Sequence, residues 1–70
     1  MNNIRNLVKK LIVSKGMTIK QVAQQMSEMT NYKYTGKVIT DKLSRETIRL
    51  SEFLMILKIL GYKIEYKDEN

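Results

Sequence analysis

The residues of this chain best suited to chemistry lie between Thr35 and Arg45. Apolar residues recur there at helical spacing, so a short helix capped by Thr35 would bury them and expose the rest. The exposed set offers a hydroxyl, a carboxylate and ammonium groups, which can hydrogen-bond to the edges of bases. Predicted to be exposed are Gly36, Lys37, Thr40, Asp41 and Lys42, and predicted to be buried are Val38, Ile39 and Leu43.

The positive charge of the chain favours a polyanion as its partner. The formal net charge is +6, the pI is about 9.7, and no acidic residue precedes Glu28. Neutralising phosphates releases counterions, so such a balance promotes binding to nucleic acid. A solvated polar helix surface is the alternative interpretation, and it is the commoner one for an isolated helix. The basic residues suited to phosphates, in or near the Thr35–Arg45 helix, are Lys20, Lys33, Lys42, Arg45 and Arg49.

The residue types present in this chain give little support for a catalytic function. The chain has neither histidine nor cysteine, which excludes disulfides, an ordinary zinc site and the usual nucleophile–base pairs. The acidic residues Asp41, Glu46 and Glu52 show no spacing typical of a carboxylate pair or a metal cluster. Glycines are isolated, so no phosphate-binding loop is present. We therefore expect no enzyme activity, no metal and no cofactor.

Two amphipathic helices precede the Thr35–Arg45 segment and would position it. The first is predicted over about Asn3 to Ser14, with a cap at Asn2 or Asn3 and an end near Gly16. The second begins with a capping box formed by Thr18 and Gln21. Its predicted buried residues are Ile19, Val22, Ala23 and Met26.

The segment from Ser27 to Tyr34 is the least regular part of the sequence. It either prolongs the second helix and then forms a loop, or it contains a short extended piece, because Tyr32 and Tyr34 alternate around Lys33. Tyrosine and lysine beside a basic helix can contact a sugar or a phosphate. We favour the other role, in which the tyrosines cover the core and leave their hydroxyls in solvent.

A very apolar helix is predicted after Arg45, with Ser51 as its cap and Gly61 as its left-handed end. It is apolar nearly all round, which predicts burial nearly all round and therefore a partner surface. Residues 62–67 then alternate strictly, as in a strand that pairs with residues 32–35 or with a second copy of the chain. The residues predicted to form the dimer interface are Leu54, Met55, Ile59, Tyr62, Ile64 and Tyr66.

The order of these segments resembles the helix-turn-helix of the phage lambda repressor/Cro (XRE-type) family. The resemblance rests on residues 18–26 with alanine at position 23, on residues 35–45, and on the Leu60-Gly61-Tyr62 ending before a strand. It implies a helical bundle whose third helix enters the DNA major groove, commonly as a dimer. It also implies base contacts by Gly36, Lys37, Thr40 and Asp41, with Thr35 near a phosphate. The chain departs from the family in its longer path over residues 28–34.

These observations predict one mainly α domain over residues 1–67, with four to five helices, a short C-terminal strand and a tail over residues 68–70. We expect a cytoplasmic, homodimeric, sequence-specific regulator that binds double-stranded DNA, with neither a membrane span nor a small-molecule ligand. A protein-binding module on the same fold is the alternative. It would grip another protein, as an antitoxin or an inhibitor does, through Met55, Ile59 and the C-terminal strand.

Overall fold

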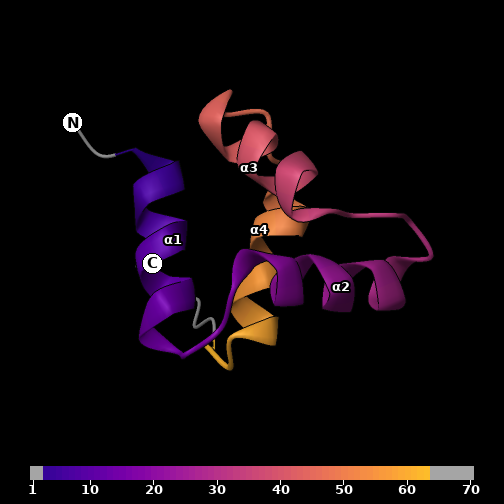
Figure 1. Ribbon diagram of the computed structural model, residues 1–70, viewed down its shortest axis with the longest axis horizontal. Coiled ribbons are helices and arrows are strands. Elements are labelled where there is room, and N and C mark those ends of the chain that lie inside the picture. The colour runs from indigo at the N-terminus through magenta and orange to yellow at the C-terminus, as the bar shows by residue number, and fades with distance from the viewer. Residues whose placement is uncertain (1–2, 64–70) are drawn as a thin grey trace, which may run out of the picture.

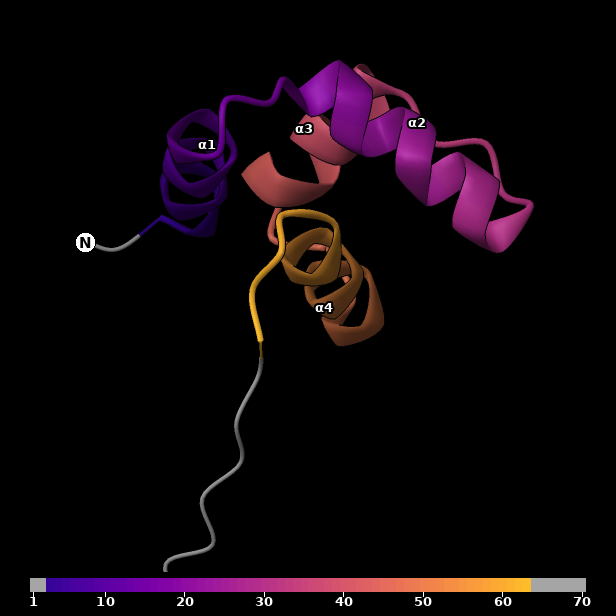
Figure 2. The same cartoon turned by 90° about the horizontal axis from the view of Figure 1, so that it is seen from below.

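Four helices make up most of residues 3–63, the part of the chain that this computed structural model describes. They are α1 (Ile4–Ser14), α2 (Ile19–Thr30), α3 (Gly36–Ser44) and α4 (Leu50–Ile59). Helix α3 lies between α1 and α2, and α4 packs behind this three-helix layer (Figures 1 and 2). The mainly α prediction is confirmed: residues 3–63 form a compact four-helix domain without a strand. None of these helices is long and apolar enough to cross a membrane.

The first three helices begin at polar caps, as their sequences predict. The Asn3 side chain accepts a hydrogen bond from the Arg5 N–H at 2.9 Å. Thr18 and Gln21 form the reciprocal capping box, with each side chain accepting from the other residue's backbone N–H at 3.2 and 2.9 Å. The Thr35 hydroxyl accepts from the Val38 N–H at 3.1 Å. Each cap satisfies a backbone donor that the helix itself leaves free.

The prediction that Ser51 caps the last helix is wrong. Helix α4 begins at Leu50, and its N-cap is Arg49. The Glu52 carboxylate reaches back and accepts a hydrogen bond from the Arg49 N–H at 2.8 Å. Because this carboxylate satisfies the donor, the helix can begin two residues earlier without a serine or threonine at its cap.

Helix ends in this chain use left-handed backbone conformations. Gly16 and Gly61 have φ values of 70° and 88°, at the two places where the sequence predicts glycine-mediated ends. After Gly61, the Tyr62 N–H donates to the Leu57 carbonyl at 2.9 Å, which satisfies a free carbonyl of α4. The end of α3 differs, because Glu46 takes the left-handed position with φ of 57°. A residue with a side chain is strained there.

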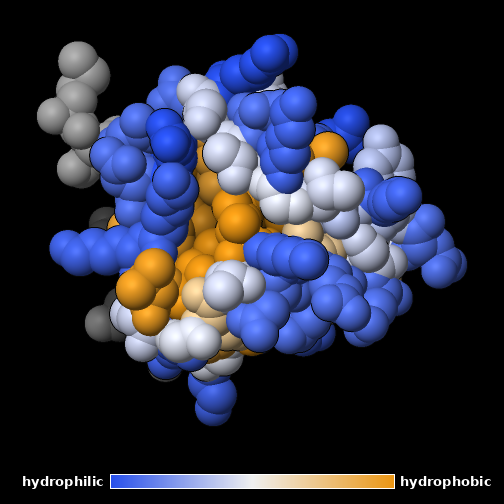
Figure 3. All heavy atoms as spheres, in the orientation of Figure 1, coloured by the Kyte–Doolittle hydropathy of each residue, from blue (hydrophilic) through white to orange (hydrophobic). Residues whose placement is uncertain are grey.

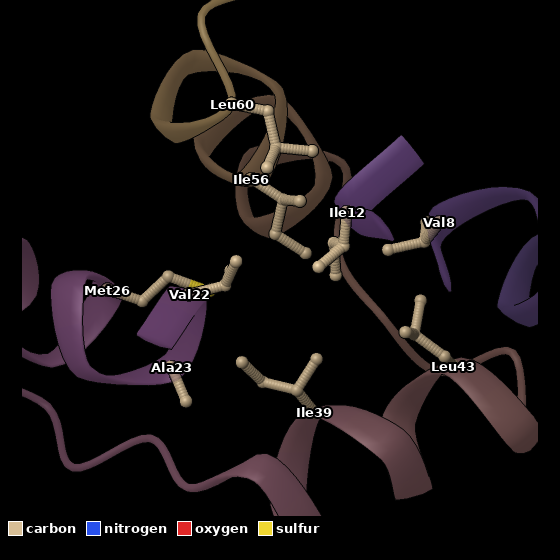
Figure 4. Close-up of a cluster of buried hydrophobic side chains, with 9 residues drawn as sticks. All are labelled: Val8, Ile12, Val22, Ala23, Met26, Ile39, Leu43, Ile56 and Leu60. Carbon is tan, nitrogen blue, oxygen red and sulfur yellow. The ribbon is translucent and has the colours of Figure 1, made fainter. Parts of the chain in front are cut away.

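Nine hydrophobic side chains from all four helices meet in one core (Figure 4). Ile39 of α3 points toward Ile56 of α4, and Leu43 of α3 points toward Val8 and Ile12 of α1, so α3 is anchored through its inner side. The predicted buried residues of α2 lie in this core except Ile19, which is half-buried. Among the predicted buried residues of α3, Val38 is likewise only half-buried. The core consists of Val8, Ile12, Val22, Ala23, Met26, Ile39, Leu43, Ile56 and Leu60.

Within residues 3–63 the chain itself buries α4 on one side only, so the expected partner surface on α4 stays a prediction. Within the helix only Glu52 and Ile56 are buried, and Leu50 is 71% exposed. The reason is geometric, because the other three helices cover α4 from one side (Figure 2). The predicted strand over residues 62–67 lies outside the described residues from Ile64 onward.

Candidate nucleic-acid interface

The side of α3 that points away from the core is open. Lys37 and Asp41 are exposed on it, and Thr40 beside them is half-buried. Thr35 at the N-cap and Arg45 at the C-cap are exposed at the two ends of the helix. We call the surface formed by Lys37, Thr40 and Asp41 the outer side of α3.

Gly36 does not face outward, contrary to the sequence-based expectation. A Cβ atom added to it would lie 3.4 Å from Cγ2 of Ile19 and 3.9 Å from the backbone of Lys20. Gly36 therefore faces α2, and its lack of a side chain lets the first turn of α3 pack closely on the first turn of α2. Its role here is packing between helices.

Lys42 is also misplaced by the sequence pattern. Its Nζ lies 3.2 Å from Oε2 of Glu52, and the Lys42 side chain is only 28% exposed. This ion pair joins the inner side of α3 to the first turn of α4. Lys42 is thus engaged inside the domain, whereas Lys37 on the same helix is exposed.

Glu52 is the buried centre of this connection, with only 4% of its surface exposed. Besides Lys42 and the Arg49 N–H, it accepts a hydrogen bond from the Tyr34 hydroxyl at 2.8 Å. Burial alone would raise the pKa of the Glu52 carboxyl, but these donors outweigh burial and hold that pKa below its ordinary value. Burial and the hydrogen bond to Glu52 raise the pKa of Tyr34 to about 12. At neutral pH the pair is therefore a carboxylate and a neutral phenol.

Ser27 fixes the loop that leads into α3. Its hydroxyl accepts from the Tyr34 N–H at 2.8 Å and lies 2.9 Å and 3.0 Å from the carbonyl oxygens of Ala23 and Tyr34. Helix α2 runs on to Thr30 and ends at Asn31 in a left-handed conformation, so the helix-then-loop alternative is confirmed. Tyr34 then points to Glu52 on α4, so its ring does not lie over the outer side of α3.

Four of the predicted DNA-binding residues line one open cavity of about 660 Å³ between α2 and the loop before α3. Lys20 comes from α2, Lys33 from the loop, and Thr35 and Gly36 from the start of α3. Glu28 also lines this cavity and adds an opposing charge. The fold therefore brings Lys20 and Lys33 together, although they are far apart in the sequence.

The surface formed by α1, α2 and α3 has hydrophilic residues along its margins and hydrophobic residues at its centre (Figure 3). The polar groups available to a ligand on this side therefore surround an apolar centre. Within residues 3–63 there is no cluster of three or more acidic residues that could hold a metal ion.

The predicted dimer residues divide into three groups. Met55, Ile59 and Tyr62 are half-buried and pack against the core cluster, so part of their surface is already used within the chain. The Lys15 ammonium also lies over the Tyr62 ring, 4.6 Å from the ring centre. Leu54 is half-buried without belonging to that packed set. Ile64 and Tyr66 lie outside the described residues.

Sequence reasoning missed the residues that hold α3 in place. Ser27 and Tyr34 lie in the segment with the weakest pattern, and the sequence singled out Glu52 only as an acid without the spacing of a carboxylate pair or metal cluster. Glu52 lies three residues after the N-cap Arg49, which is the spacing of a capping-box acid, and that signal could have located the start of α4. Its pairing with Lys42 and Tyr34 depends on tertiary packing.

Comparison with protein-family models, curated proteins and solved structures found no match for this chain. Over residues 3–63 it is a small four-helix all-α domain, and these comparisons assign it to no family.

Proposed function

We propose that this protein is a sequence-specific double-stranded DNA-binding regulator of the phage or mobile-element repressor type, which acts as a homodimer. The outer side of α3 would enter the major groove. The observation that carries the proposal is the contrast within α3: its inner side is fixed to α2 and α4, and its outer side is open. A rigidly held, exposed polar helix is what groove reading requires.

The exposed groups on α3 suggest a division of labour between base reading and backbone contact. Lys37 can donate to guanine and Asp41 can accept from cytosine, with Thr40 as a further hydrogen-bonding group. Thr35, Arg45 and the lysines of the cavity suit phosphates. Gly36 and Lys42 are not part of this proposal, because one packs on α2 and the other pairs with Glu52. The two-fold contact of the dimer would rest on Tyr62, Ile64 and Tyr66.

Selection of binding sites from a random duplex pool tests the proposal. We expect one sequence to be enriched, and its binding to weaken steeply with added salt because phosphate contacts supply most of the affinity. Lys37→Ala and Thr40→Ala should alter base preference, whereas Lys20→Ala, which removes one of the cavity lysines, should weaken binding to all sequences alike. Lys58→Ala on α4 is a control that removes the same charge from a helix not proposed to touch DNA.

Equal binding to every duplex at moderate salt would contradict the claim of sequence-specific regulation. It would leave a non-specific polyanion binder, whose affinity should depend on the number of lysines and not on their place in the fold. The Lys20 and Lys37 variants separate these two results, since only sequence-specific binding makes their effects differ in kind.

A further inference from the structure

Three leucines lie on the side of α4 that points away from the rest of the domain. Leu50, Leu54 and Leu57 recur at the spacing of four and then three residues, which places them on one side of a helix. Leu50 is 71% exposed, the other two are half-buried, and none of the three belongs to the hydrophobic set packed on the core. In Figure 2 the other three helices lie on one side of α4, and no described helix lies on its far side. We call these residues the leucine stripe.

The spacing of the leucine stripe fits a helix as its partner. Two amphipathic helices pack through residues that recur every three or four positions, so a row of three leucines offers matching anchors for such a row on another helix. Fully burying one leucine side chain gains about 1.5–3 kcal/mol relative to leaving it exposed. Leu50, the most exposed of the three, has the most to gain.

The charges beside the leucine stripe are basic. Arg49 directly precedes Leu50, Lys58 follows Leu54 by one helical turn, and both are exposed. Glu52 is the only acidic residue within α4, and it is buried and paired with Lys42. From Arg45 to Lys63, Glu46 is the one exposed acidic residue. A partner with acidic residues beside its apolar row would complement this surface, whereas a second copy of the chain would bring like charges against it.

We propose that the leucine stripe is the docking surface for an acidic amphipathic helix of another protein. This interaction goes beyond DNA binding and uses a different side of the molecule. Ile56 of α4 points toward Ile39 of α3 (Figure 4). The stripe lies on the other side of α4, since Leu54 is two residues from Ile56. Lys37 and Asp41 are each two residues from Ile39, and therefore lie on the opposite side of α3. A docked helix leaves the outer side of α3 free, so DNA and the partner bind at the same time.

Synthetic peptides test this proposal without DNA. One labelled helix of about 18 residues carries a leucine row flanked by glutamates, a second carries the same row flanked by lysines, and a third keeps the glutamates but has serines in place of the leucines. Fluorescence anisotropy with the full chain should show binding of the first peptide alone. Leu50→Ser and Leu54→Ser should each weaken it by about tenfold, which corresponds to one anchoring contact. Leu7→Ser on α1 is the matched control, since Leu7 is 50% exposed, and should change binding less than twofold.

Circular dichroism of each variant establishes that it is folded, and Leu50→Ser remains informative if Leu54→Ser unfolds the chain. Failure of the glutamate–leucine peptide to bind, or equal binding of all three peptides, would overturn the proposal. Sedimentation provides the other decisive outcome: a dimer that dissociates on Leu50→Ser or Leu54→Ser would mean that a second copy occupies the stripe. None of these results bears on whether α3 reads DNA, so the two proposals fail separately.

Discussion

The two sides of α3 each carry a lysine, and the two lysines have different roles. Lys42 on the inner side reaches the buried Glu52 carboxylate at 3.2 Å, whereas Lys37 on the outer side is exposed. A lysine paired with a buried acid contributes to the fold, because removing either partner leaves an uncompensated charge. An exposed lysine contributes little to stability and remains available to a ligand. The comparison teaches that location within the fold, and not residue type, separates structural from functional cations in this chain.

Removal of the buried acid should have the largest effect. Glu52→Ala leaves the Lys42 ammonium, the Tyr34 hydroxyl and the Arg49 N–H without their acceptor, so we expect a loss of about 3 kcal/mol in the free energy of unfolding. Urea denaturation measures it. Glu28→Ala, which removes an exposed carboxylate from α2, should change stability by less than about 0.5 kcal/mol. Similar losses for both variants would contradict the assigned role of Glu52.

Stability should also fall in acid because of Glu52. Its folded-state pKa lies below the ordinary value of 4.5, so the ionised carboxylate stabilises the fold above that pH. This contribution is lost as the pH falls through the lower, folded-state pKa. Unfolding free energies measured between neutral pH and strong acid should therefore decline in the wild type and decline less in Glu52→Gln. Parallel curves for the two proteins would show that another group causes the acid sensitivity.

Loss of the loop contact should have a smaller effect. Ser27→Ala removes the hydroxyl that accepts from the half-buried Tyr34 N–H, which should cost roughly 1–2 kcal/mol. Ser44→Ala, at the exposed end of α3, is the matched control and should be nearly neutral. If thermal melts of the two variants coincide, Ser27 does not hold the loop.

Relief of backbone strain should change stability in the opposite direction. Glu46 ends α3 with φ of 57°, so Glu46→Gly should raise the free energy of unfolding by up to about 1 kcal/mol. Glu28→Gly, inside α2, should lower it by about the same amount, because glycine is unfavourable in a helix. Chemical denaturation of both variants checks the signs, and a loss of stability in both would show that Glu46 is not strained.

The sequence predicted the elements of this fold better than their connections. Caps and periodicity are local signals, which is why Asn3, Thr18 and Thr35 marked three helix starts correctly. The start of α4 was placed two residues late, because an N-cap arginine has no local preference and depends on Glu52. The prediction that Lys37 and Asp41 of α3 are exposed was correct.

Gly36 and Lys42 were assigned to the wrong side of α3 because their positions depend on neighbouring helices. The close approach of α2 determines which way Gly36 faces, and the Glu52 carboxylate of α4 determines which way the Lys42 side chain points. A helical wheel places a residue at an angle but does not show which neighbouring helix covers that angle.

The base preference of two lysine variants tests the central claim most directly. We expect Lys37→Ala to keep the wild-type free energy of unfolding within about 0.5 kcal/mol, to lose about tenfold in affinity for its selected duplex, and to prefer a different base at one position. Lys42→Ala should lose stability but, at a temperature where it is folded, select the same sequence as the wild type. If Lys42→Ala changed the selected sequence and Lys37→Ala did not, the outer side of α3 would not be the surface that reads DNA.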